Sequence, residues 1–251
     1  IIMTLFSIFG GDKLALAASG AKPITQEDAP EVFRMVENVA ITAGIPMPKV
    51  YIMDEQVMNA FATGRNPQHA SIALTTGLIN NLENEELEAV IAHELSHIRN
   101  YDSRVMTIVV VLVGVIALVS DWVFRISFFG GGRRNRDSSE RNGQIGAILA
   151  VVGLIFIILS PIIAELIKLA ISRKREYLAD ASAVLLTRYA DGLIRALEKI
   201  GNQKNTMRHA NTATAHLFFV SPFGPGKAVS RLFSTHPPLE DRIRALRAMG
   251  S

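Results

Sequence analysis

The pattern of hydrophobic and polar positions divides the chain into short amphipathic elements and two long apolar stretches. Apolar residues at helical spacing predict a helix over residues 30–43 and another over residues 82–98, which contains neither Pro nor Gly. Short runs at residues 49–53, 59–63 and 71–75 are typical of strands joined by turn-rich links. The pattern therefore predicts a mainly α fold with a small antiparallel β-sheet beside the second helix.

The two long apolar stretches predict a membrane component. Residues 105–120 carry no charge, and the apolar run continues to residue 129 with Asp121 and Arg125 inside it. Residues 143–164 are also free of charge, and these 22 residues (164 − 143 + 1) can cross a hydrocarbon core at about 1.5 Å each. We predict a transmembrane helical hairpin over residues 105–171. The alternative is a buried hairpin of a soluble protein, because Asp121 interrupts the first run.

Composition and charge support the membrane interpretation and narrow the chemistry. The chain is 49% hydrophobic with a mean hydropathy of +0.27, which is high for a soluble domain. The net charge is only +3 and the basic residues flank the apolar runs, which favours a lipid bilayer as partner and not nucleic acid. The absence of cysteine excludes disulfides, a thiol nucleophile and a cysteine-based zinc site.

The apolar pattern also predicts the division of the chain. Residues 1–24 form an apolar stub and lead-in, residues 25–104 and 172–251 form the two halves of a core, and the hairpin is inserted between them with a flexible Gly/Arg-rich linker at residues 130–142. The chain starts at Ile and not Met, and no basic residue precedes its first apolar run, so we expect a trimmed form and no signal peptide.

The candidate chemistry lies in the second helix, in the sequence His93-Glu94-Leu95-Ser96-His97. Residues four apart share one helix face, so both histidines can direct a ring nitrogen at a point about 2 Å away, as zinc requires. Glu94 lies one residue round the helix, where it can take a proton from the attacking water. The alternative is a chance pair of surface histidines, but only 6 His occur in 251 residues and the surrounding positions are apolar.

A catalytic zinc ion needs a third protein ligand. In the absence of cysteine a carboxylate is favoured, and Glu176 and Asp180 share a helix face directly after the second apolar run. Taken alone, they could be a solvated acidic pair beside a basic cluster. A hairpin returns its ends to one place, however, and so brings Glu176 to the metal helix as third ligand. Asp180 would then orient a histidine through the ring N–H that the metal does not use.

Four stretches together carry a family resemblance: Asn59-Ala60-Phe61-Ala62-Thr63-Gly64, Ala92 to Asn100, Arg175 to Asp180, and Ser234 to Ile243. The chain resembles the HtpX family of bacterial membrane zinc proteases, relatives of the CAAX prenyl endopeptidases. The resemblance implies a gluzincin-like core, one zinc ion per chain, and a multi-pass protein of the bacterial inner membrane with a cytosol-facing site. Two N-terminal membrane helices of the family have no counterpart here beyond the apolar stub.

The resemblance also implies a function in membrane protein quality control and stress response. It implies an endopeptidase that cleaves damaged, misfolded or misassembled membrane proteins, and it places His236 and Arg242 near the substrate or the developing oxyanion. Alternatively, His236 only caps or packs against the last helix. A non-catalytic adaptor or pseudoprotease that binds clients is the rival function, and a soluble zinc hydrolase is a third. The sequence sets no oligomeric state.

Substrate binding is predicted at the second strand. Its small side chains and its place near the metal helix suggest an edge strand that hydrogen-bonds an extended peptide. The candidate contacts are Asn59, Ala60, Phe61, Ala62 and Thr63. The alternative is an ordinary inner strand.

Overall fold

The computed structural model describes residues 12–109, 112, 140–203, 205–208, 217–220, 222 and 236–249, with the side chains of 140–165 described only at Leu159 and Ile163. The chain forms two compact units. Unit 1 comprises Ile1–Arg104 and Ser172–Ser251, and unit 2 comprises Val105–Ile171. The predicted division into a stub, two core halves and a membrane hairpin stays a prediction.

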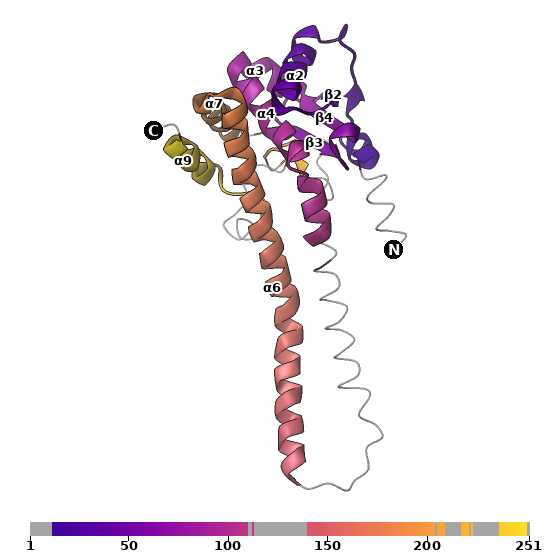
Figure 1. Ribbon diagram of the computed structural model, residues 1–251, viewed down its shortest axis with the longest axis vertical. Coiled ribbons are helices and arrows are strands. Elements are labelled where there is room, and N and C mark those ends of the chain that lie inside the picture. The colour runs from indigo at the N-terminus through magenta and orange to yellow at the C-terminus, as the bar shows by residue number, and fades with distance from the viewer. Residues whose placement is uncertain are drawn as a thin grey trace. The chain divides into compact units, whose positions relative to one another are not determined.

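Unit 1 contains a four-stranded sheet with the order β1-β2-β4-β3 (Figure 1). Its strands are β1 (Lys22–Pro23), β2 (Lys49–Met53), β3 (Ala60–Gly64) and β4 (Ala70–Thr75), and a short 3₁₀ helix, η1 (Pro67–His69), precedes β4. All six residues of β4 are buried, which suits a strand with neighbours on both sides. In this strand order β3 lies at one edge of the sheet, as the sequence predicted.

The prediction of an antiparallel sheet is wrong, because the sheet is mixed. β3 pairs antiparallel with β4 and β1 antiparallel with β2, but β2 and β4 run parallel, with Val50 opposite Ile72. The prediction assumed that strands adjacent in sequence pair with each other, which holds for about two-thirds of them. Here β4 inserts between β2 and β3, so β2 meets a strand that runs in its own direction.

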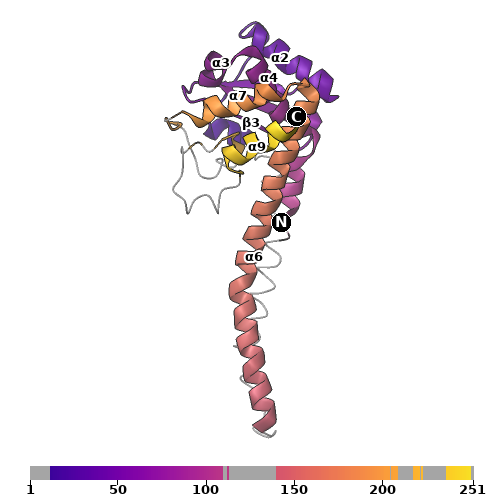
Figure 2. The same ribbon diagram turned by 90° about the vertical axis from the view of Figure 1, so that its left-hand side faces the viewer.

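The helices of unit 1 surround α4 (Asn84–Arg99), which packs against α2 (Pro30–Ala43), α7 (Ala190–Gly201), β3 and β4 (Figure 2). α2 ends at Gly44, whose φ of 68° suits a residue without a side chain. α3 (Thr76–Asn81) follows β4 directly, and the Thr75 hydroxyl accepts from Leu78 N–H at its start. Every residue of α4 from Ala89 to Ser96 is buried, so the helix is covered on all sides and lies at the centre of the core.

The returning part of the chain completes unit 1. α6 (Glu140–Thr187) enters this unit at Ser172, and α9 (Leu239–Met249) packs against α7 (Figure 2). Ala179 and Ala183 are buried on the side of α6 that faces the core. Glu176 and Asp180 are buried on the same part of α6.

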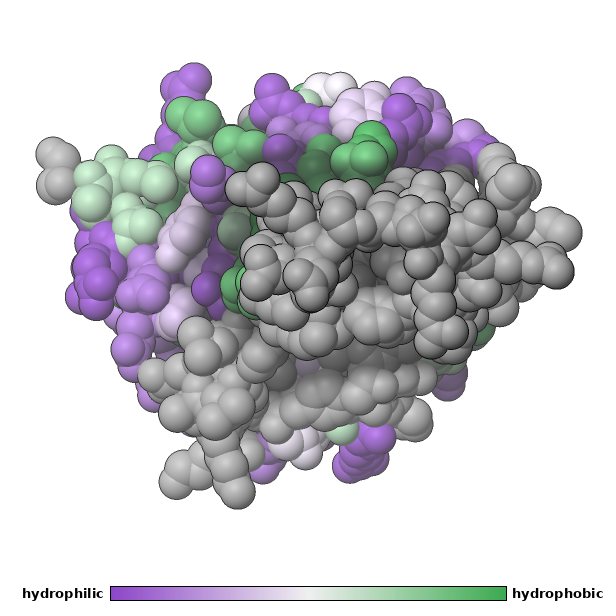
Figure 3. Space-filling model, turned by 90° about the horizontal axis from the view of Figure 1, so that it is seen from below, coloured by the Kyte–Doolittle hydropathy of each residue, from purple (hydrophilic) through white to green (hydrophobic). Residues whose placement is uncertain are grey.

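The first apolar run of the predicted hairpin lies largely outside the described residues, since residues 110, 111 and 113–139 are not among them. Within the described part of the chain, no helix is both long and apolar enough to cross a bilayer. Unit 2 exposes several large apolar side chains: Ile108, Leu112, Leu159, Ile163, Leu166 and Ile167. Seen from below, the described surface carries apolar residues among polar ones (Figure 3). Crossing of a membrane by residues 105–171 stays a prediction.

Candidate metal centre

The two histidines of α4 face one point. A capping box between Glu83 and Glu86 starts the helix, and the four-residue spacing then places His93 and His97 on one face. Their Nε2 atoms lie 3.1 Å apart, and their rings meet edge to face. His93 is fully buried, whereas one-fifth of the His97 side chain is exposed, so the cluster opens towards solvent on the His97 side.

Glu176 on α6 completes the cluster, although it follows His97 by 79 positions (176 − 97). Its Oε1 lies 3.5 Å from His97 Nε2, and its Oε2 lies 3.7 Å from His93 Nε2. One ligand atom from each of the three residues falls within 4.8 Å of the others. Two histidines and a carboxylate are the ligand set of one class of catalytic zinc site.

The hydrogen bonds of the two rings show that these residues fit a cation. His93 Nδ1 lies 2.9 Å from Asp180 Oδ1, and His97 Nδ1 lies 2.7 Å from Asp102 Oδ2. An ionised carboxylate only accepts hydrogen bonds, so each Nδ1 carries the hydrogen and each Nε2 presents a lone pair. Two lone pairs at this separation repel unless a proton or a metal cation lies between them. Ligand atoms about 2.0–2.2 Å from a tetrahedral ion lie about 3.3 Å apart, which matches the cluster.

The charge states of the cluster suit metal binding. Burial lowers the pKa of His93 to about 4, despite the hydrogen bond that its Nδ1–H donates to Asp180, so its ring is neutral at neutral pH. Burial opposes ionisation of Glu176, but His236, His97 and Arg242 outweigh it and hold the pKa of this carboxyl well below its ordinary value. A neutral imidazole and an ionised carboxylate are the forms that bind zinc.

Glu94 lies beside the ligands and is almost fully buried. Burial raises the pKa of its carboxyl to about 7, against the opposing effects of His97 and of a hydrogen bond from the Ala62 backbone N–H. A carboxylate that accepts from the strand at the sheet edge is held at one position between β3 and the metal ligands. Such a group can accept a proton near neutral pH.

Arg242 on α9 is buried completely and does not line an accessible surface. Its Nη2 and Nε donate to the two oxygens of Asp180 at 2.6 and 2.9 Å, and its guanidinium stacks on the ring of Phe219. Burial opposes ionisation of Asp180, but the charge of Arg242 outweighs it and lowers the pKa of this carboxyl to about 2. Arg242 therefore holds the carboxylate that faces His93.

His236 lies just before α9 and is mostly buried. Its Nδ1 is 3.1 Å from Glu176 Oε2, so it stands at the rim of the ligand cluster. The following Pro237 and Pro238 keep this segment extended up to the start of α9. His236 is thus brought to the site across 60 positions of sequence from Glu176 (236 − 176).

The candidate substrate strand is partly occupied on its outer edge. Phe219 N–H donates to Ala60 C=O at 2.8 Å, and Phe218 forms an isolated bridge with Phe61. Asn59 is fully buried, and its side-chain amide donates to Val220 C=O at 2.9 Å. Asn59, Ala60 and Phe61 therefore pair with the segment Leu217–Val220, and this antiparallel register places Leu217 opposite Ala62.

The alternation of β3 directs the backbone of Ala62 to the same outer edge. Asn59 C=O accepts from Thr75 N–H on the β4 side, and Ala60 C=O accepts on the opposite side. The direction of the backbone N–H and C=O groups alternates along an antiparallel strand. The backbone groups of Phe61 and Thr63 therefore point towards β4, while those of Ala62 point to the outer edge, beside Glu94. Of the predicted contact residues, Ala62 lies at the metal centre with its backbone on the outer edge.

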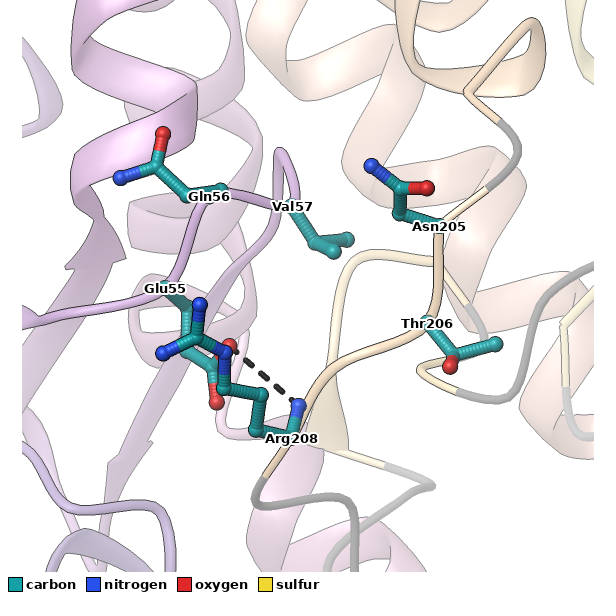
Figure 4. Close-up of a pocket in the computed structure, with 6 residues that line it drawn as sticks. All are labelled: Glu55, Gln56, Val57, Asn205, Thr206 and Arg208. Atoms are coloured by element: carbon teal, nitrogen blue, oxygen red, sulfur yellow. Dashed lines mark hydrogen bonds between the residues drawn. The ribbon is translucent and has the colours of Figure 1, made fainter.

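A separate pocket of about 400 Å³ lies where the loop after β2 meets the segment after α7. Its lining residues are Glu55, Gln56, Val57, Asn205, Thr206 and Arg208, and Arg208 N–H donates to the Glu55 carboxylate (Figure 4). None of the metal-centre residues lines this pocket.

Sequence reasoning missed Asp102, which contacts His97, and Phe219, whose ring lies edge to face with His93 at 4.9 Å. The only signal for Asp102 was an acidic residue five positions after His97. Phe219 left no signal, because it is one apolar residue among several in its segment.

Comparisons with known proteins find a matching family profile and similar sequences. The profile of Peptidase family M48 matches residues 26–250. A Protease HtpX homolog of Streptococcus equi subsp. equi is 48% identical over 242 residues, which cover 96% of this chain and 81% of the relative. A Protease HtpX homolog of Caldanaerobacter subterraneus is 49% identical over 239 residues, which cover 95% and 78%.

Among solved structures, the crystal structure of S. mikatae Ste24p matches with a TM-score of 0.63 at 22% identity. The match covers 98% of this chain and 56% of the Ste24p chain, so this chain spans little more than half the length of that protein. This likeness concerns the fold.

Proposed function

This chain belongs to peptidase family M48, and from that premise we propose that it is a zinc-dependent endopeptidase of the bacterial inner membrane. The chain is an HtpX-related metallopeptidase with His93, His97 and Glu176 as candidate zinc site. We assign one zinc ion to each chain, an active site on the cytosolic side, and damaged, misfolded or misassembled membrane proteins as substrates. The convergence of two Nε2 lone pairs and one carboxylate beside the buried Glu94 carries the catalytic part of this proposal.

Each residue of the site has a separate role in peptide hydrolysis. Zinc held by the three ligands supplies a Lewis acid and lowers the pKa of water. Glu94 accepts a proton from the attacking water and passes it to the leaving amine, for which its fixed position beside Ala62 is suited. His236, at the rim of the cluster, faces the developing oxyanion and stabilises its charge.

Asp180 and Arg242 do not bind the metal themselves but hold the ligand His93 in position. Asp180 accepts from His93 Nδ1–H and so fixes the ring with Nε2 towards the metal. Arg242, which the family resemblance placed near substrate, instead fixes Asp180, because its guanidinium is buried and bound to both carboxylate oxygens.

Substrate binds as an added strand beside Ala62. The outward C=O of Ala62 accepts from a peptide N–H, and this pairing aligns an extended chain past Glu94. Main-chain pairing tolerates almost any side chain, which suits an enzyme with diverse unfolded substrates. Phe219 takes the Ala60 position and Leu217 lies opposite Ala62 in the same register, so a strand added at Ala62 displaces Leu217.

Replacement of Glu94 by Gln tests the catalytic role, because it removes the base and leaves the ligands. The full-length variant in detergent should keep one zinc per chain by elemental analysis, while casein hydrolysis falls by about three orders of magnitude or more. Glu88→Gln, the same change on the same helix, is the matched control and should cleave like the wild type, with cleavage stopped by chelator.

Two outcomes of this experiment count against the proposal. A Glu94→Gln variant that keeps a tenth of the wild-type rate would show that Glu94 is not the base. Wild-type protein that binds zinc but cleaves neither casein nor an unfolded membrane protein would favour a non-catalytic adaptor that binds clients.

A further inference from the structure

Asp102 reaches His97 only because the backbone breaks after α4. In a continuous helix, residues five apart are separated by about 140° around the axis, so Asp102 would point away from His97. Tyr101 has a φ of 56°, a left-handed conformation that a residue with a side chain rarely adopts. This break turns the chain, and Asp102 Oδ2 then meets His97 Nδ1 at 2.7 Å.

The other oxygen of Asp102 is held by Arg175. The Arg175 guanidinium forms an ion pair with Asp102 Oδ1, and its Nη2 also donates to the Asn100 C=O at 2.9 Å. Arg175 directly precedes Glu176 on α6. The Asp102 carboxylate therefore connects the ring of His97 to Arg175, the residue next to Glu176.

These contacts lie where the inserted unit leaves and rejoins the core. Unit 1 is interrupted between Arg104 and Ser172, so Asp102 and Arg175 stand at the two ends of the interruption. His97 and Glu176 stand at the same two ends. The ion pair is thus placed to fix the separation of two candidate ligands that the sequence sets 79 positions apart (176 − 97).

We propose that Asp102 and Arg175 are positioning residues for the metal, acting through His97 and Glu176. This inference rests on the proposed zinc site. Asp102 keeps the Nδ1 hydrogen in place and the Nε2 lone pair directed at the ligand cluster. Arg175 holds Asp102 in that position. We call His97, Asp102 and Arg175 the outer triad.

Zinc affinity of the full-length protein, measured by competition with a chromogenic chelator, tests the outer triad without reference to proteolysis. Asp102→Asn keeps the size of the side chain and removes its charge, and should weaken zinc binding by about 10–100-fold. Arg175→Lys keeps the charge but loses the planar fork, and should weaken it by a smaller factor of about three to ten. Glu198→Gln, which removes one carboxylate from an exposed ion pair with Arg247, should leave zinc affinity unchanged.

Cobalt substitution provides a signature that a purely structural role would not change. The visible absorption of bound Co²⁺ should shift in position or intensity in Asp102→Asn, and should match the wild type in Glu198→Gln. Circular dichroism of each variant checks folding, and Arg175→Lys decides the matter if Asp102→Asn does not fold.

The result separates two failures. If wild-type protein binds no zinc, the proposed function fails. If it binds zinc and both outer-triad variants keep affinity within twofold and the wild-type cobalt spectrum, the positioning role alone is overturned.

Discussion

The two candidate histidine ligands are held by similar groups in different surroundings. His93, Asp180 and Arg242, which we call the inner triad, have side chains that are 0%, 2% and 0% exposed. The outer triad repeats the order histidine, carboxylate, arginine with 21%, 8% and 21% exposure. In each triad the carboxylate accepts from Nδ1–H and leaves Nε2 for the metal, so the chemistry at the ligand is the same.

Because it is more deeply buried, the inner triad is expected to stabilise the fold as well as the metal site. A charged group without water must keep its partner, because an unpaired buried charge costs several kcal/mol. The ion pair of Arg242 and Asp180 also ties α9 to α6 through the centre of the core. The outer triad borders solvent, which can hydrate either charge if its partner is lost. We therefore expect the inner triad to support both fold and metal, and the outer triad to support mainly the metal.

The largest effect is expected from removal of the inner arginine. Arg242→Leu leaves the Asp180 carboxylate buried without a cation and should lower the free energy of unfolding by about 3–5 kcal/mol. Arg175→Leu, the same change in the outer triad, should lower it by only about 1 kcal/mol, because Arg175 is one-fifth exposed and water can reach the Asp102 carboxylate once the guanidinium is gone. Denaturant titration of the zinc-free proteins measures both. Equal losses would remove the distinction between the triads.

A smaller effect is expected from removal of the inner carboxylate. Asp180→Ala should weaken zinc binding by about 10–100-fold, because His93 loses the group that fixes its ring. It should also destabilise the zinc-free protein, since the buried Arg242 loses its closest carboxylate and keeps only the longer ion pair with Glu176 at 3.6 Å. Asp102→Asn should share only the first effect. Chelator competition and thermal unfolding, carried out on the same preparations, compare the two; a stable Asp180→Ala protein with wild-type zinc affinity would contradict the assignment.

The smallest effect is expected at the edge of β3, which belongs to neither triad. If substrate pairs with Ala62, N-methylation of the one peptide residue that donates to Ala62 C=O should lower kcat/KM about tenfold, the loss of one hydrogen bond of about 1.4 kcal/mol. Methylation of the next residue, whose N–H points the other way, should have little effect. Zinc content should be the same throughout. A methylation scan without this alternation would contradict strand addition.

Much of the candidate site could be predicted because helical geometry is local. The spacing of His93 and His97 fixes a shared face in any helix, and the place of Glu94 follows from the same geometry. The prediction of Glu176 needed one further step, the inference that a chain leaving the core in a hairpin must return to it. The presence and approximate positions of α2, α4, β2, β3 and β4 followed from apolar periodicity.

The tertiary structure decided what depends on contacts between distant segments. The parallel pairing of β2 with β4, the burial of Arg242 and the occupation of Ala60 by Phe219 arise from packing of segments with no local relation to each other. The contact of Asp102 with His97 could not be predicted either, although only five positions separate them. The left-handed backbone at Tyr101 turns the chain, and this turn decides where the Asp102 side chain points. Periodicity records which face of an element is buried, whereas the backbone angle at a single break and the identity of the neighbour across a face are set only when the whole core assembles.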